Sequence, residues 1–274
     1  MDRVEAGPVS DPDEVIAELM FADPSAGQPT VYFIRPSEVD WDRVEGRFHR
    51  MPMAIRNGRK AVQQPSLDEE GFVFVRHESQ VCDFYDDAEI RRVYYPELER
   101  LTRDLTGARN VFVFDHTVRG QQGGTRGSVE VELPSDMMHC DLTVQAAEET
   151  LAQVVPGAGE GRWVQLNIWR PIAGPLTTLP LAVCDGRSIK PESYVFTPLV
   201  RPDFESEFLT LAYDPEQRWS YLPAMTRDEV IVFKNYDSDP AKTPCSVHGA
   251  FVDPFSPINA PARESIEVRV FAQL

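Results

Sequence analysis

The part of the sequence that most restricts the fold is the stretch after Arg162, which consists of short apolar segments separated by turns. Segments of this length and spacing predict β-strands packed as a sandwich or barrel. With one more strand around His139, they make about nine strands. We therefore expect a mainly β fold with flanking helices, of the double-stranded β-helix (jelly roll, cupin-like) type. The predicted strands cover residues 163–169, 179–184, 194–199, 208–212, 219–222, 230–234, 246–252 and 265–271.

The first half of the chain is expected to surround this core. Residues 1–29 predict an acidic lead and one packing helix, because Asp11-Pro12-Asp13-Glu14 is typical of a helix N-terminus and apolar residues follow it. Residues 87–105 predict a longer helix that is kinked at Pro96 and ends at Gly107. The other predicted elements are strands over 30–34, 71–75 and 110–114, a hairpin turn at Asn57-Gly58, a glycine-rich loop over 120–127 that is either a mobile lid or a flexible hairpin connection, and a helix over 144–154.

No internal repeat or linker divides the chain. Residues 1–274 are therefore expected to form a single domain, in which about 30–130 flank a jelly-roll core at about 131–274. The four cysteines have no metal-binding spacing and are too sparse for a disulfide scaffold, which favours reduced thiols in the cytoplasm. The net charge of −17 disfavours nucleic acid, and no apolar run is long enough to span a membrane. The composition carries no signal for an oligomeric state.

The strongest candidate for chemistry is His139-Cys140-Asp141. On a strand, residues i and i+2 point to the same face, so His139 and Asp141 could bind one metal ion. His248, on a late strand, would complete a set of two histidines and one carboxylate, which leaves open positions on Fe(II). The alternative is that His139 is only a structural histidine. Cys140 points to the opposite face and is expected to be a buried thiol.

A second candidate site lies on the last predicted strand, at Arg263 and Ser265. A guanidinium group binds a carboxylate through two parallel hydrogen bonds, and a neighbouring hydroxyl adds another. A 2-oxo acid could then bind the metal at one end and Arg263 at the other. Two alternatives stay open: Arg269 could be the anchor in place of Arg263, and both arginines could belong to a solvent-exposed polar face whose opposite face is Ile266, Val268 and Val270.

Several longer passages resemble the Fe(II)/2-oxoglutarate-dependent oxygenases, and more narrowly the AsaB-like hydroxylase/desaturase branch with its cephem-methoxylase-related and gibberellin-desaturase-like members. The resemblance extends from about residue 80 to the C-terminus, and Asp141 distinguishes the chain from halogenating variants, which lack that ligand. The passages are Asp83-Phe84-Tyr85-Asp86, Phe114-Asp115-His116-Thr117-Val118-Arg119, His139-x-Asp141, Asn167-Ile168-Trp169-Arg170-Pro171-Ile172, Val232-Phe233-Lys234-Asn235-Tyr236-Asp237-Ser238, His248-Gly249-Ala250-Phe251 and Arg263-Glu264-Ser265-Ile266-Glu267-Val268-Arg269.

The resemblance implies Fe(II) on His139, Asp141 and His248, 2-oxoglutarate on Arg263 and Ser265, and O2 as co-substrate. Apart from it, Gln165 and Asn167 share one face of their strand and are expected near the cofactor. His116, Arg119 and Arg170 are candidate substrate contacts, although an ion pair within the scaffold is the alternative for His116 and Arg119.

Three functions compete at this point. The first is a non-haem oxygenase that couples decarboxylation of 2-oxoglutarate to hydroxylation, desaturation or cyclisation of a small molecule in a small, mostly apolar pocket, with release of succinate and CO2. The second is a jelly-roll metal enzyme that does not use 2-oxoglutarate, and the third is a non-catalytic small-molecule-binding barrel. Release of succinate and CO2 that depends on iron would separate the first from the other two.

Overall fold

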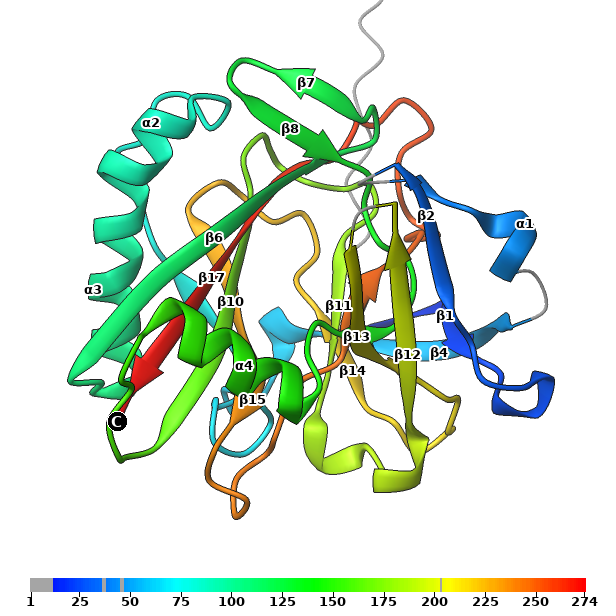
Figure 1. Ribbon diagram of the computed structural model, residues 1–274. Helices are drawn as coiled ribbons and strands as arrows, with labels where there is room; N and C mark the ends of the chain where they lie inside the picture. Colours follow the sequence, from blue (N-terminus) through cyan, green and yellow to red (C-terminus); the bar gives the residue numbers. More distant parts are fainter. Residues whose placement is uncertain (1–11, 36–37, 45–46, 203) are drawn as a thin grey trace, which may run out of the picture.

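Two β-sheets packed face to face form the centre of the molecule (Figure 1), as described by a computed structural model that covers residues 12–35, 38–44, 47–202 and 204–274. Within these residues the larger sheet has ten strands and the smaller has seven. The larger sheet has the order β1 (Glu14–Ala22), β4 (Phe48–Asn57), β14 (Trp219–Tyr221), β11 (Leu181–Cys184), β16 (His248–Ala250), β9 (His139–Cys140), β13 (Phe204–Leu211), β12 (Tyr194–Arg201), β2 (Val31–Arg35) and β3 (Glu38–Val39). The smaller sheet has the order β5 (Phe72–Arg76), β15 (Glu229–Asp237), β10 (Trp163–Pro171), β17 (Glu264–Gln273), β6 (Asn110–Gly120), β8 (Val129–Glu132) and β7 (Gly124–Arg126).

The order of strands follows the jelly-roll pattern, in which segments distant in sequence become neighbours. β9 pairs antiparallel with β16, and His139 lies directly opposite His248. β10 lies between β15 and β17 in the smaller sheet and pairs antiparallel with both. Early and late strands are therefore neighbours in both sheets, and the predicted fold class is confirmed.

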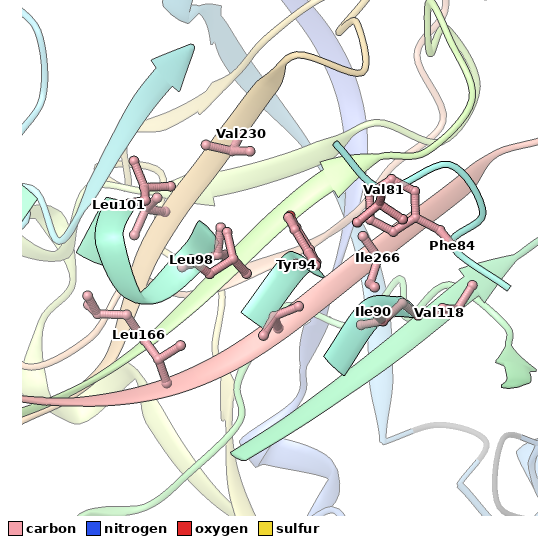
Figure 2. Packing of buried hydrophobic residues seen from close by; sticks show 14 of the residues in the cluster. Val81, Phe84, Ile90, Tyr94, Leu98, Leu101, Val118, Leu166, Val230 and Ile266 are labelled. Carbon is pink, nitrogen blue, oxygen red and sulfur yellow. The ribbon is translucent and has the colours of Figure 1, made fainter. Parts of the chain in front are cut away.

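Helix α3 (Tyr95–Thr106) covers the outer face of the smaller sheet (Figure 1). It continues a short helix α2 (Asp87–Glu89) and a π-helical turn (Ile90–Tyr94), and it ends at Gly107, which adopts the left-handed conformation that favours glycine. Tyr94 and Leu98 pack on Leu166 and Ile266 of the sheet (Figure 2). Pro96 cannot donate a backbone hydrogen bond to the turn before it, and the helix is π-helical over Ile90–Tyr94, directly before the start of α3.

The packing of α3 determines which face of β17 is turned inward. Ile266, Val268 and Val270 lie in the hydrophobic cluster beneath α3. Residues alternate along a strand, so the polar set that includes Ser265 and Arg269 faces the opposite sheet. The alternative of a solvent-exposed polar face is therefore wrong.

Two further α-helices lie among the described residues, besides short 3-10 turns at Pro24–Ala26, Gly186–Ser188 and Pro191–Ser193. α4 (Val144–Val154) begins at Thr143, whose side chain accepts a hydrogen bond from the Ala146 N–H, and α1 (Trp41–Val44) is a single turn. No helix among the described residues is long and apolar enough to cross a membrane. The four cysteines lie within the described part of the chain and are free thiols.

The sequence misassigned the N-terminal region. Residues 14–22 form strand β1 instead of a helix: Val15, Leu19 and Phe21 are buried, whereas Ile16 is 59% exposed. β1 pairs along its whole length with β4, which the sequence did not predict. Residues 1–11, which include the start of the predicted helix, lie outside the described residues.

Two predicted connections were also wrong in detail. Asn57-Gly58 is not a hairpin turn: Asn57 ends β4, a 3-10 turn (Gly58–Lys60) follows, and β5 belongs to the other sheet. The glycine-rich stretch over 120–127 is not a loop throughout, because β7 and β8 form an antiparallel hairpin at the end of the smaller sheet. A lid function of this hairpin stays a prediction.

Candidate metal centre and active site

His139, Asp141 and His248 converge between the two sheets. Because β9 and β16 place the two histidines opposite each other, their ring centroids are 4.4 Å apart. Asp141 follows directly after β9, and its Oδ1 lies 3.4 Å from His139 Nε2 and 3.6 Å from His248 Nε2. One ligand atom from each of the three residues lies within 4.8 Å of the others. One small cation could contact all three atoms.

Hydrogen bonds from the surrounding residues orient these three side chains. His139 Nδ1 lies 2.8 Å from the Met137 carbonyl oxygen, and His248 Nδ1 lies 3.4 Å from the Ser246 carbonyl oxygen. A proton on each Nδ1 would leave the lone pair on Nε2, which faces the centre. Bonds of this kind fix the ring orientation in metal sites and make the histidine a better ligand.

The second oxygen of Asp141 is held from the opposite side. Its Oδ2 accepts hydrogen bonds from Asn167 Nδ2 at 3.0 Å and from Arg269 Nε at 2.9 Å. Oδ1 therefore remains directed at the two imidazoles. Burial alone would raise the pKa of Asp141, but Arg269 and the two imidazoles outweigh it and hold the pKa well below its ordinary value. Burial, together with His139, lowers the pKa of His248 to about 3. A neutral imidazole and an ionised carboxylate are the protonation states that bind a divalent cation.

Arg263 directly precedes β17, is only 3% exposed, and has no carboxylate within ion-pair distance among the described residues. Its Nε donates to Ser265 Oγ at 3.1 Å and its Nη1 donates to the Leu179 carbonyl oxygen at 2.9 Å. A guanidinium group has five N–H donors, so three remain. Burial, with a smaller contribution from Arg119, lowers the pKa of Arg263 to about 9.

A buried donor without a hydrogen-bond partner among the described residues lies beside this guanidinium. Arg263 is stacked over the ring of Trp169, with its central carbon 5.1 Å from the ring centroid. The Trp169 Nε1 is buried and has no hydrogen-bond partner among the described residues. An unsatisfied buried donor is costly, and this indole N–H together with the remaining N–H groups of Arg263 fits an anionic ligand.

Arg269, the alternative anchor, is already paired. Besides Asp141, it donates to Asp115 Oδ2 at 2.9 Å and to Glu267 Oε1 at 2.6 Å. Burial, partly offset by Arg269, raises the pKa of Glu267. The geometry therefore gives Arg269 a role in orienting Asp141, and leaves Arg263 as the arginine with free donors.

Gln165 and Asn167 both point into the space between the sheets and are completely buried. Gln165 Nε2 donates to Asn167 Oδ1 at 2.8 Å, and Asn167 in turn holds Asp141. Asn235 is a residue that sequence reasoning missed: its Oδ1 accepts from the Asp141 backbone N–H at 3.2 Å and lies 3.3 Å from the buried Cys140 thiol. The only signal for it was its position in the passage 232–238.

A cavity of about 760 Å³ opens on the side of the centre that His139 and Asp141 line. Arg119 lies in its wall and donates to Glu132 Oε2 at 2.9 Å. His116 borders it, with its ring Nδ1 2.9 Å from the Tyr95 hydroxyl of α3. The prediction of a mostly apolar pocket is wrong, since acidic and basic side chains form much of the wall.

Arg170 does not contribute to this cavity. It is completely buried on the face of β10 that α3 covers, where it is stacked over Tyr94. Its guanidinium donates to the backbone carbonyl oxygens of His77 and Arg227. The expectation that Arg170 lies at the pocket rim is wrong, because the alternation along β10 points it away from the inner face.

Comparison with known proteins places these features in context. A family model described as "Oxidoreductase/YMDC permease-like domain" matches residues 19–273. The Fe(II)/2-oxoglutarate-dependent dioxygenase nvfI of Aspergillus novofumigatus is 32% identical over 270 residues, covering 92% of this chain and 94% of that protein. The hydroxylase/desaturase efuI of Hormonema carpetanum is 31% identical over 251 residues, covering 81% and 83%. Among solved structures, the iron and alpha-ketoglutarate-dependent endoperoxidase NvfI matches with a TM-score of 0.81 and 28% identity, covering 95% and 98% of the two chains.

Proposed function

Because the chain belongs to the Fe(II)/2-oxoglutarate-dependent dioxygenases of the hydroxylase/desaturase type, we propose that it oxidises a small organic molecule of the natural-product kind, by hydroxylation, desaturation or cyclisation. The observation that supports this most is the convergence of His139, Asp141 and His248 on one point, next to a cavity that His139 and Asp141 line. Succinate and CO2 would be the products of the co-substrate.

In this proposal His139 Nε2, Asp141 Oδ1 and His248 Nε2 hold Fe(II). Three protein ligands of this type would leave positions open on the metal, and the iron, when bound, would supply the oxidising chemistry. The protein keeps the ligand atoms in place before the metal arrives. Asn167 and Arg269 hold the far oxygen of Asp141, so the near oxygen cannot rotate away.

Arg263 is proposed to bind the distal carboxylate of 2-oxoglutarate. Its side chain is buried, Ser265 fixes its Nε, the Leu179 carbonyl fixes one Nη, and three N–H groups remain for a ligand. A guanidinium held at two atoms loses little freedom when it binds a carboxylate through two hydrogen bonds. The free N–H of Trp169 can add a third donor.

The cavity is proposed to hold the substrate and to exclude bulk water. Its volume of about 760 Å³ suits a small molecule rather than a polymer. The name of the relative nvfI specifies both Fe(II) and 2-oxoglutarate. This favours the proposed function over the two others, a metal enzyme without 2-oxoglutarate and a non-catalytic barrel. A cytoplasmic location and the absence of a nucleic-acid partner remain predictions of the sequence.

The test is a two-stage measurement on the intact protein. Anaerobic titration with Fe(II) and 2-oxoglutarate should give one metal per chain and a visible charge-transfer absorption that His248→Ala abolishes. Addition of O2 and a panel of small molecules should then release succinate with the stoichiometry of an oxidised product. Binding of iron without any effect of 2-oxoglutarate would contradict the proposal.

A further inference from the structure

The cavity next to the metal centre has two chemically different walls. The larger sheet contributes an apolar wall: Phe33 from β2, Leu199 from β12 and Phe208 from β13. Phe208 presents its ring at 77° to that of His139, with centroids 6.1 Å apart. The smaller sheet contributes a polar wall that includes Asp115 and Glu132. A ligand in this cavity would lie with an apolar side along the first wall.

Arg201 lies at the end of the apolar wall and has no polar partner among the described residues. It is the last residue of β12, and its Nε is buried without a hydrogen-bond acceptor. Among the described residues, its guanidinium makes a cation–π contact with the ring of Phe33, whose centroid is 5.0 Å from the guanidinium carbon. A guanidinium that is partly desolvated and has no acceptor is costly, unless a ligand supplies one.

The other arginines of the same cavity show how unusual this is. Arg91 pairs with Asp87 at 2.9 Å, Arg119 pairs with Glu132 at 2.9 Å, and Arg269 pairs with three carboxylates. The whole chain has 44 acidic residues against 27 basic ones. Acidic partners are therefore abundant, and within the described part of this cavity only Arg201 has none.

The strand register indicates how far Arg201 lies from the metal centre. β13 pairs Thr210 with His139, and β12 pairs Arg201 with Phe204. The six steps along the strand from Thr210 to Phe204 span roughly 20 Å at about 3.3 Å per residue. After subtraction of the reach of the arginine and histidine side chains, a ligand that touches both ends would measure on the order of 10 Å.

We propose that Arg201 binds a carboxylate at one end of an elongated, otherwise apolar substrate, whose opposite end is oxidised beside His139. The apolar body would lie on Leu199, Phe33 and Phe208. This inference rests on the proposed function, because it takes the cavity as the substrate site, and it adds the substrate class: a monocarboxylic acid with a hydrocarbon body of that length.

The test uses protein loaded with Mn(II), which supports binding without turnover, and saturated with 2-oxoglutarate so that the Arg263 site is filled. The probes are 6-phenylhexanoate and its neutral primary amide, titrated by calorimetry. The wild-type protein should bind the acid at least about tenfold more tightly than the amide. Arg201→Gln should abolish this preference by weakening only the acid.

Arg91→Gln is the matched control, because it removes the same charge from the same cavity at a residue that is already paired with Asp87. It should retain the preference for the acid. Equal affinities of the wild-type protein for acid and amide, including no measurable binding of either, would overturn the proposal, and so would an unchanged preference in Arg201→Gln. Titration of Mn(II) and 2-oxoglutarate into each variant gives a separate answer on the proposed function: normal binding of both keeps that function intact even if the inference about Arg201 fails.

Discussion

Replacement of Arg263 by glutamine should separate 2-oxoglutarate binding from iron binding. Arg263 has no hydrogen bond or ion pair to the three candidate metal ligands, and its buried guanidinium is stacked over the ring of Trp169. Glutamine keeps part of the side-chain volume and one amide donor but removes the charge and the two-pronged geometry. The affinity for 2-oxoglutarate should therefore fall while the affinity for the metal is unchanged.

The expected size of the effect follows from the number of free donors. Two charge-assisted hydrogen bonds contribute about 1.5–3 kcal/mol each, and the glutamine recovers part of this, so a loss of about 3 kcal/mol is expected. That corresponds to an affinity about 150-fold lower. In a thermal unfolding experiment, 2-oxoglutarate at 100 times its dissociation constant should stabilise the wild-type protein by about 2.7 kcal/mol. With an unfolding entropy of about 2.1 cal/mol/K per residue, this is an increase in Tm of about 5 °C for 274 residues.

The assay is anaerobic calorimetry with Mn(II) followed by 2-oxoglutarate, with the Tm shift as a second readout. Arg269→Gln serves as the comparison, because it removes a donor from Asp141 and should weaken metal binding about 10–100-fold. Without 2-oxoglutarate, Arg263→Gln should be no less stable than the wild-type protein, since it removes a buried charge that lacks a carboxylate partner. If Arg269→Gln loses 2-oxoglutarate affinity and Arg263→Gln does not, the assignment of the anchor is refuted.

Three further predictions concern the metal centre and the scaffold. His248→Ala should retain less than about a tenth of the wild-type iron after dialysis, measured by metal analysis, since only two ligands remain; stoichiometric iron would contradict its role. Asn167→Leu, which has a similar volume, should weaken Fe(II) binding about 10–100-fold in a competition assay with a chelator, whereas a wild-type affinity would mean that the amide does not orient the ligand. Asp237→Asn should lower the free energy of unfolding in urea at pH 7 by about 3 kcal/mol, because it leaves Arg162 and Lys234 without their shared carboxylate. Burial would raise the pKa of Asp237, but Arg162 and Lys234 outweigh it and lower the pKa in the folded protein. The contribution of Asp237 to the free energy of unfolding is therefore present above about pH 4 and is lost as the pH falls through the folded-state pKa. The wild-type and variant proteins should then have similar stabilities in acid.

The local pattern of apolar and polar residues was sufficient to predict the late strands but not to predict the first strand, β1. Residues 163–169 alternate apolar and polar side chains between clear turns, and β10 forms there. In residues 15–20 the apolar positions 15, 16, 19 and 20 also match a helix, but burial of Val15, Ala17 and Leu19 shows the period of a strand. The deciding factor is β4, which supplies backbone hydrogen bonds along the whole of β1. Propensity within the segment contains no information on a partner that is about 30 residues away.

The site shows the same division between local and non-local information. The two-residue spacing of His139 and Asp141 is local, and the structure brings both onto one centre with His248. The sequence could not show which face of β17 is turned inward, since apolar and polar residues alternate regularly along the strand and either set could face the other sheet. It depends on α3, which covers Ile266, Val268 and Val270. The contact of Asn235 with Asp141 depends likewise on how the two sheets are packed against each other.

Charge pairing offers a way to recognise ligand sites that sequence motifs do not reveal. In a chain with a net charge of −17, an arginine inside the protein will usually find a carboxylate, as Arg269 does, or backbone carbonyls, as Arg170 does. Arg263 and Arg201 keep guanidinium donors without such partners among the described residues, although both are at least partly desolvated. Their desolvation costs free energy in the protein without ligands, and a bound carboxylate would offset that cost. One of them lies beside Trp169 and the other at the far end of the cavity. We therefore propose that the two arginines bind two different anions, Arg263 the co-substrate and Arg201 the substrate.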